Sequence, residues 1–285
     1  MTAFDITLAE RQSAQLSPSR LAQAVQAVRL NGYVLLNELI DPAILAPIRD
    51  RMLADVARIL AREDVPFNFN RGNIQQDPPP FPPFLSREVL CNEIVISITR
   101  SILGKGLKNG MYSGNTALPH STGRQPVHAD MGQLWPNLEV AHPAYALVVN
   151  VLPVDVSPTN GSTEIWPGSH LDTSVVLQDG DIKVSPERLE QQRQVAPGFQ
   201  YSARAGSVVI RDMRMWHAGM PNHTAQPRPM IAMIHYVSWW GGLPPLEFSA
   251  GSEPYLEHPE LGQVVRYTQA EPDYTHRNEA YDFNQ

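Results

Sequence analysis

The sequence predicts an α+β protein that is mainly β, a jelly roll with helices from its N-terminal third packed on one sheet. Helical patterns fill residues 17–105, and short apolar segments between Gly, Asn and Pro turns follow over residues 110–240. This order is typical of a two-sheet β core covered by helices. A chain of 285 residues can bury one large core. We therefore expect a single domain, 1–285, with its core at about 20–240.

The N-terminal part, residues 17–105, contains signals for three helices. Ser17-Pro18 is a typical helix start and Asn31-Gly32 a typical end, and a strand is expected from Tyr33 to Leu36. Asp41-Pro42 begins the second helix, and a third is expected around residues 87–103. The apolar residues expected to form the buried stripe of the second helix are Ile44, Leu45, Ile48, Met52, Val56 and Ile59. Residues 1–16 are polar and expected to be loose.

The core of residues 110–240 is expected to consist of strands. The candidates are Met111–Ala117, Pro126–Asp130, Ala144–Val151, Ser162–Trp166, Gln200–Ser202, Ser207–Arg211 and Met230–Trp239. The segment from Phe67 to Phe84 has many helix and strand breakers, which indicates a long loop that lines a pocket. Residues 171–195 are expected to form a charged, partly helical insertion. The C-terminal extension, 241–285, lacks periodicity. Its role is expected to be that of a lid or of a homodimer contact.

Composition excludes several classes of partner. The net charge of −7 argues against nucleic acid, because phosphate binding needs clustered Lys and Arg. No apolar run is long enough to cross a membrane, and no secretory signal is visible, so we expect a cytoplasmic protein. Cys91 is the single cysteine, which rules out an intrachain disulfide and a cysteine-based metal site. A small-molecule substrate remains the expectation.

Three residues suggest a metal site: His128, Asp130 and, far downstream, His217. Positions i and i+2 of a strand point to the same side, so His128 and Asp130 can reach one ion. Two imidazoles and one carboxylate on one face of a metal leave its other face open, as in non-haem Fe(II) oxygenases. The same donors also suit catalytic Zn²⁺, and a strand-end histidine bonded to a carboxylate is the simplest alternative.

Arg228 stands at the head of the last apolar strand, shortly after His217. Its guanidinium could form a bidentate pair with the carboxylate of a co-substrate. Alternation predicts that Arg228, Met230, Ala232, Ile234 and Tyr236 share one face. That face would form an interior with a polar mouth.

Candidate substrate contacts are spread over several segments. They are Gln75 and Gln76 in the long loop, Tyr112 and Asn150 on adjacent strands, Trp135 just after the metal motif, and Tyr236. Aromatic rings more often belong to the core or rim, so these assignments depend on where each side chain points.

Taken together, five motifs resemble one known family. They are His128-Ala-Asp130, Asn160-Gly-Ser-Thr-Glu-Ile-Trp-Pro-Gly-Ser-His170, Gly206-Ser-Val-Val-Ile-Arg-Asp212, Trp216-His217-Ala-Gly and Pro227-Arg228. This set resembles the phytanoyl-CoA dioxygenase (PhyH)-like family of Fe(II)/2-oxoglutarate-dependent oxygenases, over about residues 20–240. The segments Asn70 to Pro79, Leu134 to Pro136 and Arg211 to His217 look most like its kanamycin B dioxygenase-like branch.

The resemblance implies a cupin-like double-stranded β-helix in which His128, Asp130 and His217 bind Fe(II). It implies that Arg228 pairs with the distal carboxylate of 2-oxoglutarate, with further contacts from Gln125 and Thr163. O2 is then the second co-substrate, and succinate and CO2 are released. Relatives that halogenate lack the carboxylate, so Asp130 implies C–H oxidation: hydroxylation, desaturation, ring formation or ketone formation. The branch implies specialised-metabolite, for example antibiotic, biosynthesis.

Two alternatives to the dioxygenase stay open. One is a zinc- or other metal-dependent hydrolase or isomerase on a cupin-like barrel, which has no ready role for Arg228. The other is a non-catalytic jelly-roll binding module, against which the complete ligand set counts.

Overall fold

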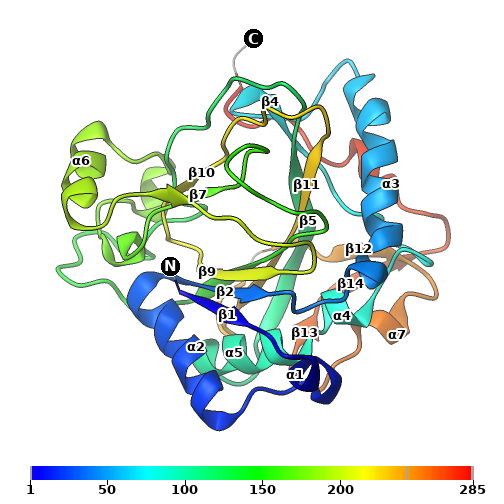
Figure 1. Cartoon of the computed structure of the whole chain (residues 1–285), viewed down its shortest axis with the longest axis horizontal. Coiled ribbons are helices and arrows are strands. Elements are labelled where there is room, and N and C mark those ends of the chain that lie inside the picture. Colours follow the sequence, from blue (N-terminus) through cyan, green and yellow to red (C-terminus); the bar gives the residue numbers. More distant parts are fainter. Residues whose placement is uncertain (1, 242, 284–285) are drawn as a thin grey trace.

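The computed structural model describes residues 2–241 and 243–283. Its main feature is a 9-stranded sheet in the order β1-β2-β9-β6-β11-β5-β4-β3, with β13 paired to β5 (Figure 1). The strands are β1 (Ala3–Asp5), β2 (Tyr33–Asn37), β9 (Val208–Asp212), β6 (Ala146–Val151), β11 (Arg228–Tyr236), β5 (Lys108–Ala117), β4 (Asn70–Gln75), β3 (Phe67–Asn68) and β13 (Gly262–Gln263). The central strands β9, β6, β11 and β5 are antiparallel to one another in this order, whereas β13 pairs with β5 in parallel.

A second sheet lies across an interior cavity from the first. It contains three short strands in the order β10-β7-β8, namely β10 (His217–Ala218), β7 (Glu164–Ile165) and β8 (Phe199–Gln200). A separate parallel pair, β12 (Leu246–Ser249) and β14 (Val265–Thr268), comes from the C-terminal extension. Two sheets that enclose a cavity, with helices outside, confirm the predicted fold class.

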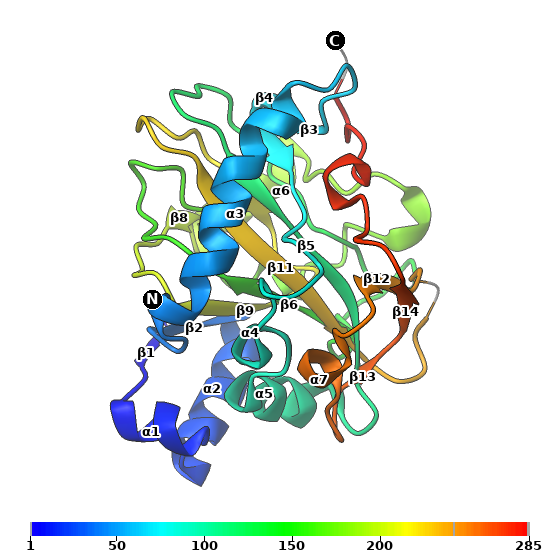
Figure 2. The same cartoon turned by 90° about the vertical axis from the view of Figure 1, so that its right-hand side faces the viewer.

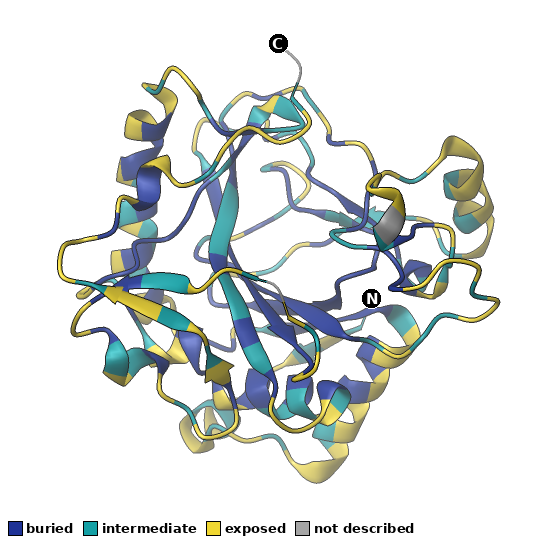
Figure 3. Cartoon of the chain, turned by 180° about the vertical axis from the view of Figure 1, so that it is seen from behind, coloured by how far each residue is buried: buried dark blue, intermediate teal, exposed yellow. Residues whose placement is uncertain are grey.

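Helices cover the outer face of the large sheet, where α3 passes across β11 (Figure 2). The helices are α1 (Leu8–Ser13), α2 (Pro18–Asn31), α3 (Pro42–Leu60), α4 (Arg87–Leu90), α5 (Glu93–Leu103), α6 (Pro186–Val195) and α7 (Glu253–Leu256), with 3-10 turns η1 (Ser169–Leu171), η2 (Leu177–Asp179) and η3 (Tyr274–His276). Because helices cover one face and the cavity wall forms the other, β6, β9 and β11 are buried along their whole length (Figure 3). Among the described residues, no helix combines the length and the apolar character that a membrane span requires.

The predicted ends of α2 and the start of α3 are confirmed. The Ser17 hydroxyl accepts from the Arg20 amide, and Gly32 closes α2 at φ 83°, in the left-handed region that glycine tolerates. Asp41 caps α3 in the same way. Within α3 the expected stripe is buried except for Ile44, which is exposed because it lies one residue before the inward-facing Leu45. The third predicted helix is divided into two helices, α4 and α5, because Asn92 caps the beginning of α5.

The N-terminal segment expected to be loose, 1–16, is ordered over the described residues 2–16, and residue 1 lies outside the described residues. Strand β1 pairs in parallel with β2, and Thr7 and Glu10 form a reciprocal capping box at the start of α1. The three residues of β1 carry no strand signal of their own, and the partner strand supplies their hydrogen bonds.

The long segment from Phe67 to Phe84 is only partly a loop. It begins with β3 and β4, and β4 continues the large sheet by pairing with β5. The polar sequence of β4 does not predict a strand. The strand forms because it is stabilised by its neighbour rather than by apolar alternation.

The expected strand Pro126–Asp130 is wrong, since only isolated bridges connect His128 to Lys183 and to His217. The insertion at 171–195 is partly helical, as expected, with η2 and α6. The division of the chain into a helical part, a core and an extension stays a prediction, and the large sheet takes strands from all three.

Candidate metal centre

His128, Asp130 and His217 come together at one end of the cavity, with one donor atom of each within 4.8 Å of the other two. The backbone brings the histidines together: the His128 amide donates to the His217 carbonyl (3.0 Å), and the His217 amide returns the bond (2.8 Å). Residues that exchange both bonds lie directly opposite each other. Their ring centroids are 4.3 Å apart. The approach of these two side chains is therefore fixed by main-chain pairing.

Each of the two imidazoles is oriented by a main-chain carbonyl. The Nδ1 atom of His128 lies 2.8 Å from the Pro126 oxygen, and that of His217 lies 3.1 Å from the Met215 oxygen. A carbonyl only accepts, so Nδ1 carries the hydrogen and Nε2 keeps a lone pair. Burial lowers the pKa of both histidines, which keeps them neutral. Neutral imidazoles held in this way are suited to bind a divalent metal.

The carboxylate of Asp130 lies between His217 and an arginine that the sequence reasoning missed. Its Oδ1 is 3.5 Å from His217 Nε2, while its Oδ2 accepts from Arg211 Nη2. Burial alone would raise the pKa of Asp130, but the Arg211 guanidinium and the two imidazoles hold it well below its usual range. Asp130 is therefore an anion with one oxygen still facing the histidines.

The cavity beside these residues has a volume of about 270 Å³. Strand β11 lines it with Arg228, Met230, Ala232 and Ile234, in agreement with the predicted alternation. The pairing of β11 with β5 shifts between Met233 and His235, whereas its pairing with β6 continues without a shift through Tyr236. Tyr236, the last residue of β11, does not line the cavity and packs against Trp240.

Arg228 is buried in the cavity wall without a carboxylate partner among the described residues. One Nη2 hydrogen bond goes to the Gly161 carbonyl, and Nε has no partner. Burial lowers the pKa of Arg228, but a guanidinium remains charged near neutral pH. A buried cation without a counterion is costly, so this end of the cavity is suited to an anionic ligand.

The other expected cofactor contacts also line the cavity. Gln125 accepts from the Gly219 amide at 2.7 Å and donates to the Asn68 carbonyl at 3.3 Å. A Cβ on Gly219 would come within 2.6 Å of Gln125 Oε1, so glycine is needed for this contact. Thr163 lies on the opposite side, just before β7.

Of the remaining substrate candidates, only Gln75 and Asn150 line the cavity. Gln76 instead bonds the Met52 carbonyl and Thr116 inside the fold. Tyr112 stacks on Phe248 of β12, with ring centroids 5.4 Å apart. Trp135 is exposed and contacts only the edge of His142 among the rings described. These three assignments, like that of Tyr236, are corrected: none of the four side chains is among the residues that line the cavity.

Several cavity residues carried no signal that sequence reasoning used. They are Asn68, Asn115, Met111, Met213, Val148 and Arg211. Arg211 could have been found, because a charged residue inside the apolar strand Val208-Val-Ile-Arg211 needs a buried partner. Among the described lining residues, the charged side chains are Arg211, Arg228 and Asp130.

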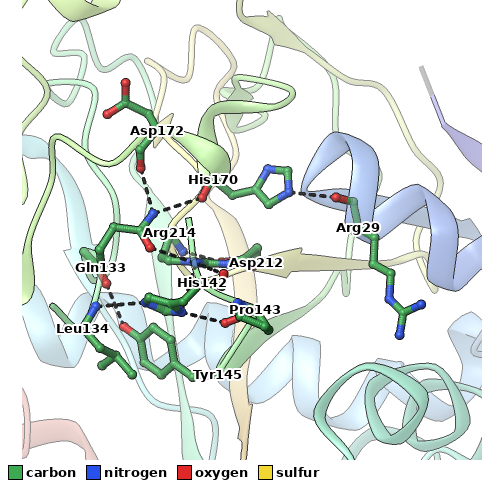
Figure 4. Close-up of polar contacts among 11 residues, drawn as sticks. Arg29, Gln133, Leu134, His142, Pro143, Tyr145, His170, Asp172, Asp212 and Arg214 are labelled. Atoms are coloured by element: carbon green, nitrogen blue, oxygen red, sulfur yellow. Dashed lines mark hydrogen bonds and ion pairs between the residues drawn. The ribbon is translucent and has the colours of Figure 1, made fainter. Parts of the chain in front are cut away.

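A second buried polar cluster connects the two segments that carry the triad (Figure 4). Arg214 donates to both Asp212 oxygens, at 2.9 and 2.8 Å, and through Nη1 to Gln133 Oε1 at 3.0 Å and the His142 carbonyl at 2.7 Å. Gln133 lies just after Asp130 and Arg214 lies just before His217. Their contact ties together the two segments that carry the triad.

Aromatic residues cover the triad from the side of β3 and the C-terminal segment. The Phe69 ring lies 4.6 Å from the His128 ring, and Tyr281 packs edge-on against Phe69 at 5.2 Å. The Phe69 amide donates to the Tyr281 carbonyl, and Asp282 pairs with Lys183. The C-terminal extension thus contributes to the wall beside the triad.

Comparison with solved structures finds proteins that share this fold. AviO1 from Streptomyces viridochromogenes matches with a TM-score of 0.59 and 19% identity, over 80% of this chain and 100% of that one. The α-ketoglutarate-dependent carbocyclase SnoK from nogalamycin biosynthesis matches with 0.56 and 20%, over 78% and 85%. EctD from S. alaskensis, with bound Fe, matches with 0.56 and 18%, over 78% and 77%. At these identities the matches show a shared fold.

Comparison with protein families gives a match over residues 28–230, which is more than half of the chain. This range includes the triad, Gln125, Thr163 and Arg228 and agrees with the resemblance expected from the motifs. The kanamycin B dioxygenase-like branch stays a prediction. The chain belongs to the phytanoyl-CoA dioxygenase (PhyH) family.

Proposed function

We propose that this protein is an Fe(II)- and 2-oxoglutarate-dependent dioxygenase that oxidises a C–H bond of a small molecule and releases succinate and CO2. The observation that carries the proposal is the presence, in one cavity, of the His128–Asp130–His217 set and of the buried Arg228, which has no carboxylate partner among the described residues. A metal-dependent hydrolase or isomerase would also use the His128–Asp130–His217 set, but it would have no use for a buried arginine such as Arg228.

His128, Asp130 and His217 would hold Fe(II), which when bound supplies the O2 activation that the organic groups of a protein lack. The Nδ1–H bonds to Pro126 and Met215 keep both Nε2 lone pairs available for the ion. The Arg228 guanidinium would pair with the distal carboxylate of 2-oxoglutarate, in a charge-assisted contact that also neutralises the buried cation. Gln125 and Thr163 would add hydrogen bonds to the same co-substrate.

The remaining cavity wall orients the substrate and excludes water. Asn150 and Gln75 offer amides, and Met111, Met213 and Met230 offer an apolar, adaptable surface. Phe69 and Tyr281 shield the histidines on one side.

The proposed oxidation outcome is one of hydroxylation, desaturation, ring formation or ketone formation. Structural neighbours from nogalamycin biosynthesis, described as a carbocyclase and an epimerase, support a role in specialised metabolism.

The test is succinate release from 2-oxoglutarate in the presence of Fe(II) and O2, with and without candidate substrates. The His128→Ala and Arg228→Met variants should lose this activity, the first through the metal and the second through the co-substrate. Arg204→Met, an exposed arginine paired with Asp155, serves as the control. Undiminished succinate release by His128→Ala, or turnover that needs no 2-oxoglutarate, would contradict the proposal.

A further inference from the structure

We propose that Arg211 is a positioning residue that limits Asp130 to one metal-facing oxygen. This inference rests on the proposed metal site and adds a residue to it that acts through a ligand. The observation behind it is the bond from Arg211 Nη2 to Asp130 Oδ2, which leaves only Oδ1 facing His217.

Arg211 is held by a strand that is paired on both sides. It lies in β9, between β2 and β6, where its Cα partners are Tyr33 and Val148. Its Nε also donates to Asn150 Oδ1 at 3.3 Å, so the guanidinium is fixed at two points. The position of its Nη2 is therefore set by the large sheet.

Asp130, by contrast, lies outside every strand. Its side chain is 32% exposed, and the neighbouring amides of Ala129 and Met131 bond to Ile182 and Met213 across irregular segments. A carboxylate in such a segment can rotate, and either turn away or bind an ion through both oxygens. The bond from Arg211 opposes both alternatives, because it holds the carboxylate in one orientation and uses a lone pair of Oδ2.

One-oxygen binding matters for the proposed chemistry. A carboxylate that binds through both oxygens takes one more position on the metal, and the two-histidine, one-carboxylate arrangement needs those positions for its co-substrate and O2. Partners that orient a ligand in this way typically change metal affinity 10- to 100-fold when they are removed.

The bonding of Arg211 also differs from that of an arginine that serves the fold alone. Arg211 lines the cavity, and its Nη1 atom is buried without a hydrogen-bond partner. A residue kept only to stabilise the fold would be expected to have its buried donors paired.

The experiment measures the binding of Co(II), an air-stable probe of the Fe(II) site, by titration calorimetry and visible absorption. Arg211→Met should raise the Co(II) dissociation constant about 10- to 100-fold and change the absorption of the bound ion, which depends on ligand number and geometry. Arg211→Lys, which keeps one charged donor, should restore part of the affinity. Arg204→Met is the matched arginine control and should bind as the wild type does.

A second pair of variants separates positioning from a general loss of structure. In an Asp130→Ala background the Arg211→Met change should have less than about a threefold effect, because the carboxylate on which it acts is gone. Thermal unfolding without metal checks that each variant is folded at the temperature of the titration.

The outcomes discriminate between the two proposals. Wild-type Co(II) affinity and absorption in Arg211→Met, or an equal loss of affinity in both backgrounds, would overturn the positioning role and leave the proposed function intact. A wild-type protein that fails to bind Co(II), or binds it equally well after Asp130→Ala, would overturn the metal site itself and the inference with it.

Discussion

Three buried arginines in this protein have very different surroundings. Arg214, Arg211 and Arg228 are 4%, 5% and 2% exposed. In the Arg214 cluster Nε, Nη1 and Nη2 all have partners, which are Asp212, Gln133 and His142. In the cavity, Arg211 Nη1 and Arg228 Nε have none. Equal burial therefore does not imply equal function, since the two arginines that line the cavity each keep an unpaired donor and Arg214 does not.

The energetic reason is that a buried, unsatisfied donor costs about 1–3 kcal/mol, and a charged one more. Such a cost persists in a native structure where a ligand removes it or where the site needs it. We therefore expect mutation of Arg214 to affect mainly the fold and mutation of Arg228 to affect mainly ligand binding.

The largest effect is expected for Arg214→Met. Removing this guanidinium leaves Asp212, itself buried, without its ion-pair partner and breaks the contact with Gln133. The free energy of unfolding should fall by about 3–5 kcal/mol, as for other buried pairs that lose one partner. Urea denaturation provides the measurement, and Arg214→Met with Asp212→Asn should recover part of the loss. A change below about 0.5 kcal/mol would remove the distinction between the two regions.

Arg228→Met tests the other side of the comparison. Because Arg228 has no anionic partner within the described fold, its loss should leave the unfolding free energy close to that of the wild type. Binding of 2-oxoglutarate in the presence of Co(II) should weaken by about 2–5 kcal/mol, the usual cost of removing one member of a buried charge pair. Calorimetric titration gives this number. Unchanged affinity would show that the co-substrate carboxylate binds elsewhere.

Buried histidines extend the comparison to pH. Burial lowers the pKa of His235, which bonds Thr99, to about 3 from its ordinary 6.5. Between these values the unfolded chain binds the proton and the folded protein does not, so this stability is complete above pH 6.5 and is lost as pH falls toward 3. At pH 5 the loss is about 2 kcal/mol.

The His235→Asn variant, whose amide can replace Nδ1 as the partner of Thr99, should show a shallower decline of unfolding free energy between pH 7 and pH 5. Denaturation at several pH values measures the slope. An identical slope in the variant and the wild type would assign the acid sensitivity to other histidines.

The smallest effect is expected at the cover over the triad. Tyr281→Ala removes the ring that packs on Phe69, a contact worth about 0.5–1.5 kcal/mol. Amide hydrogen exchange of the C-terminal segment should accelerate while that of β11 stays unchanged. Equal acceleration in both would mean that this segment is part of the core rather than a separate cover.

Sequence patterns were sufficient where the signal is local. The helix caps at Ser17, Gly32 and Asp41 and the alternation from Arg228 to Ile234 could be read from the sequence, because caps and period-two patterns depend on neighbouring residues. The triad was predicted from residue types and spacing, although the strand expected around His128 does not form.

Long-range pairing decided what the sequence could not. Strand β4 exists because β5 lies beside it, and Tyr236, at the end of β11, contacts Trp240 rather than the cavity. The contact of Arg211 with Asp130 joins β9 to an irregular segment far away in the chain. The sequence by itself determined the donors and the local elements, whereas only the tertiary structure decided which side chains meet in the cavity, because those meetings depend on backbone hydrogen bonds between distant segments.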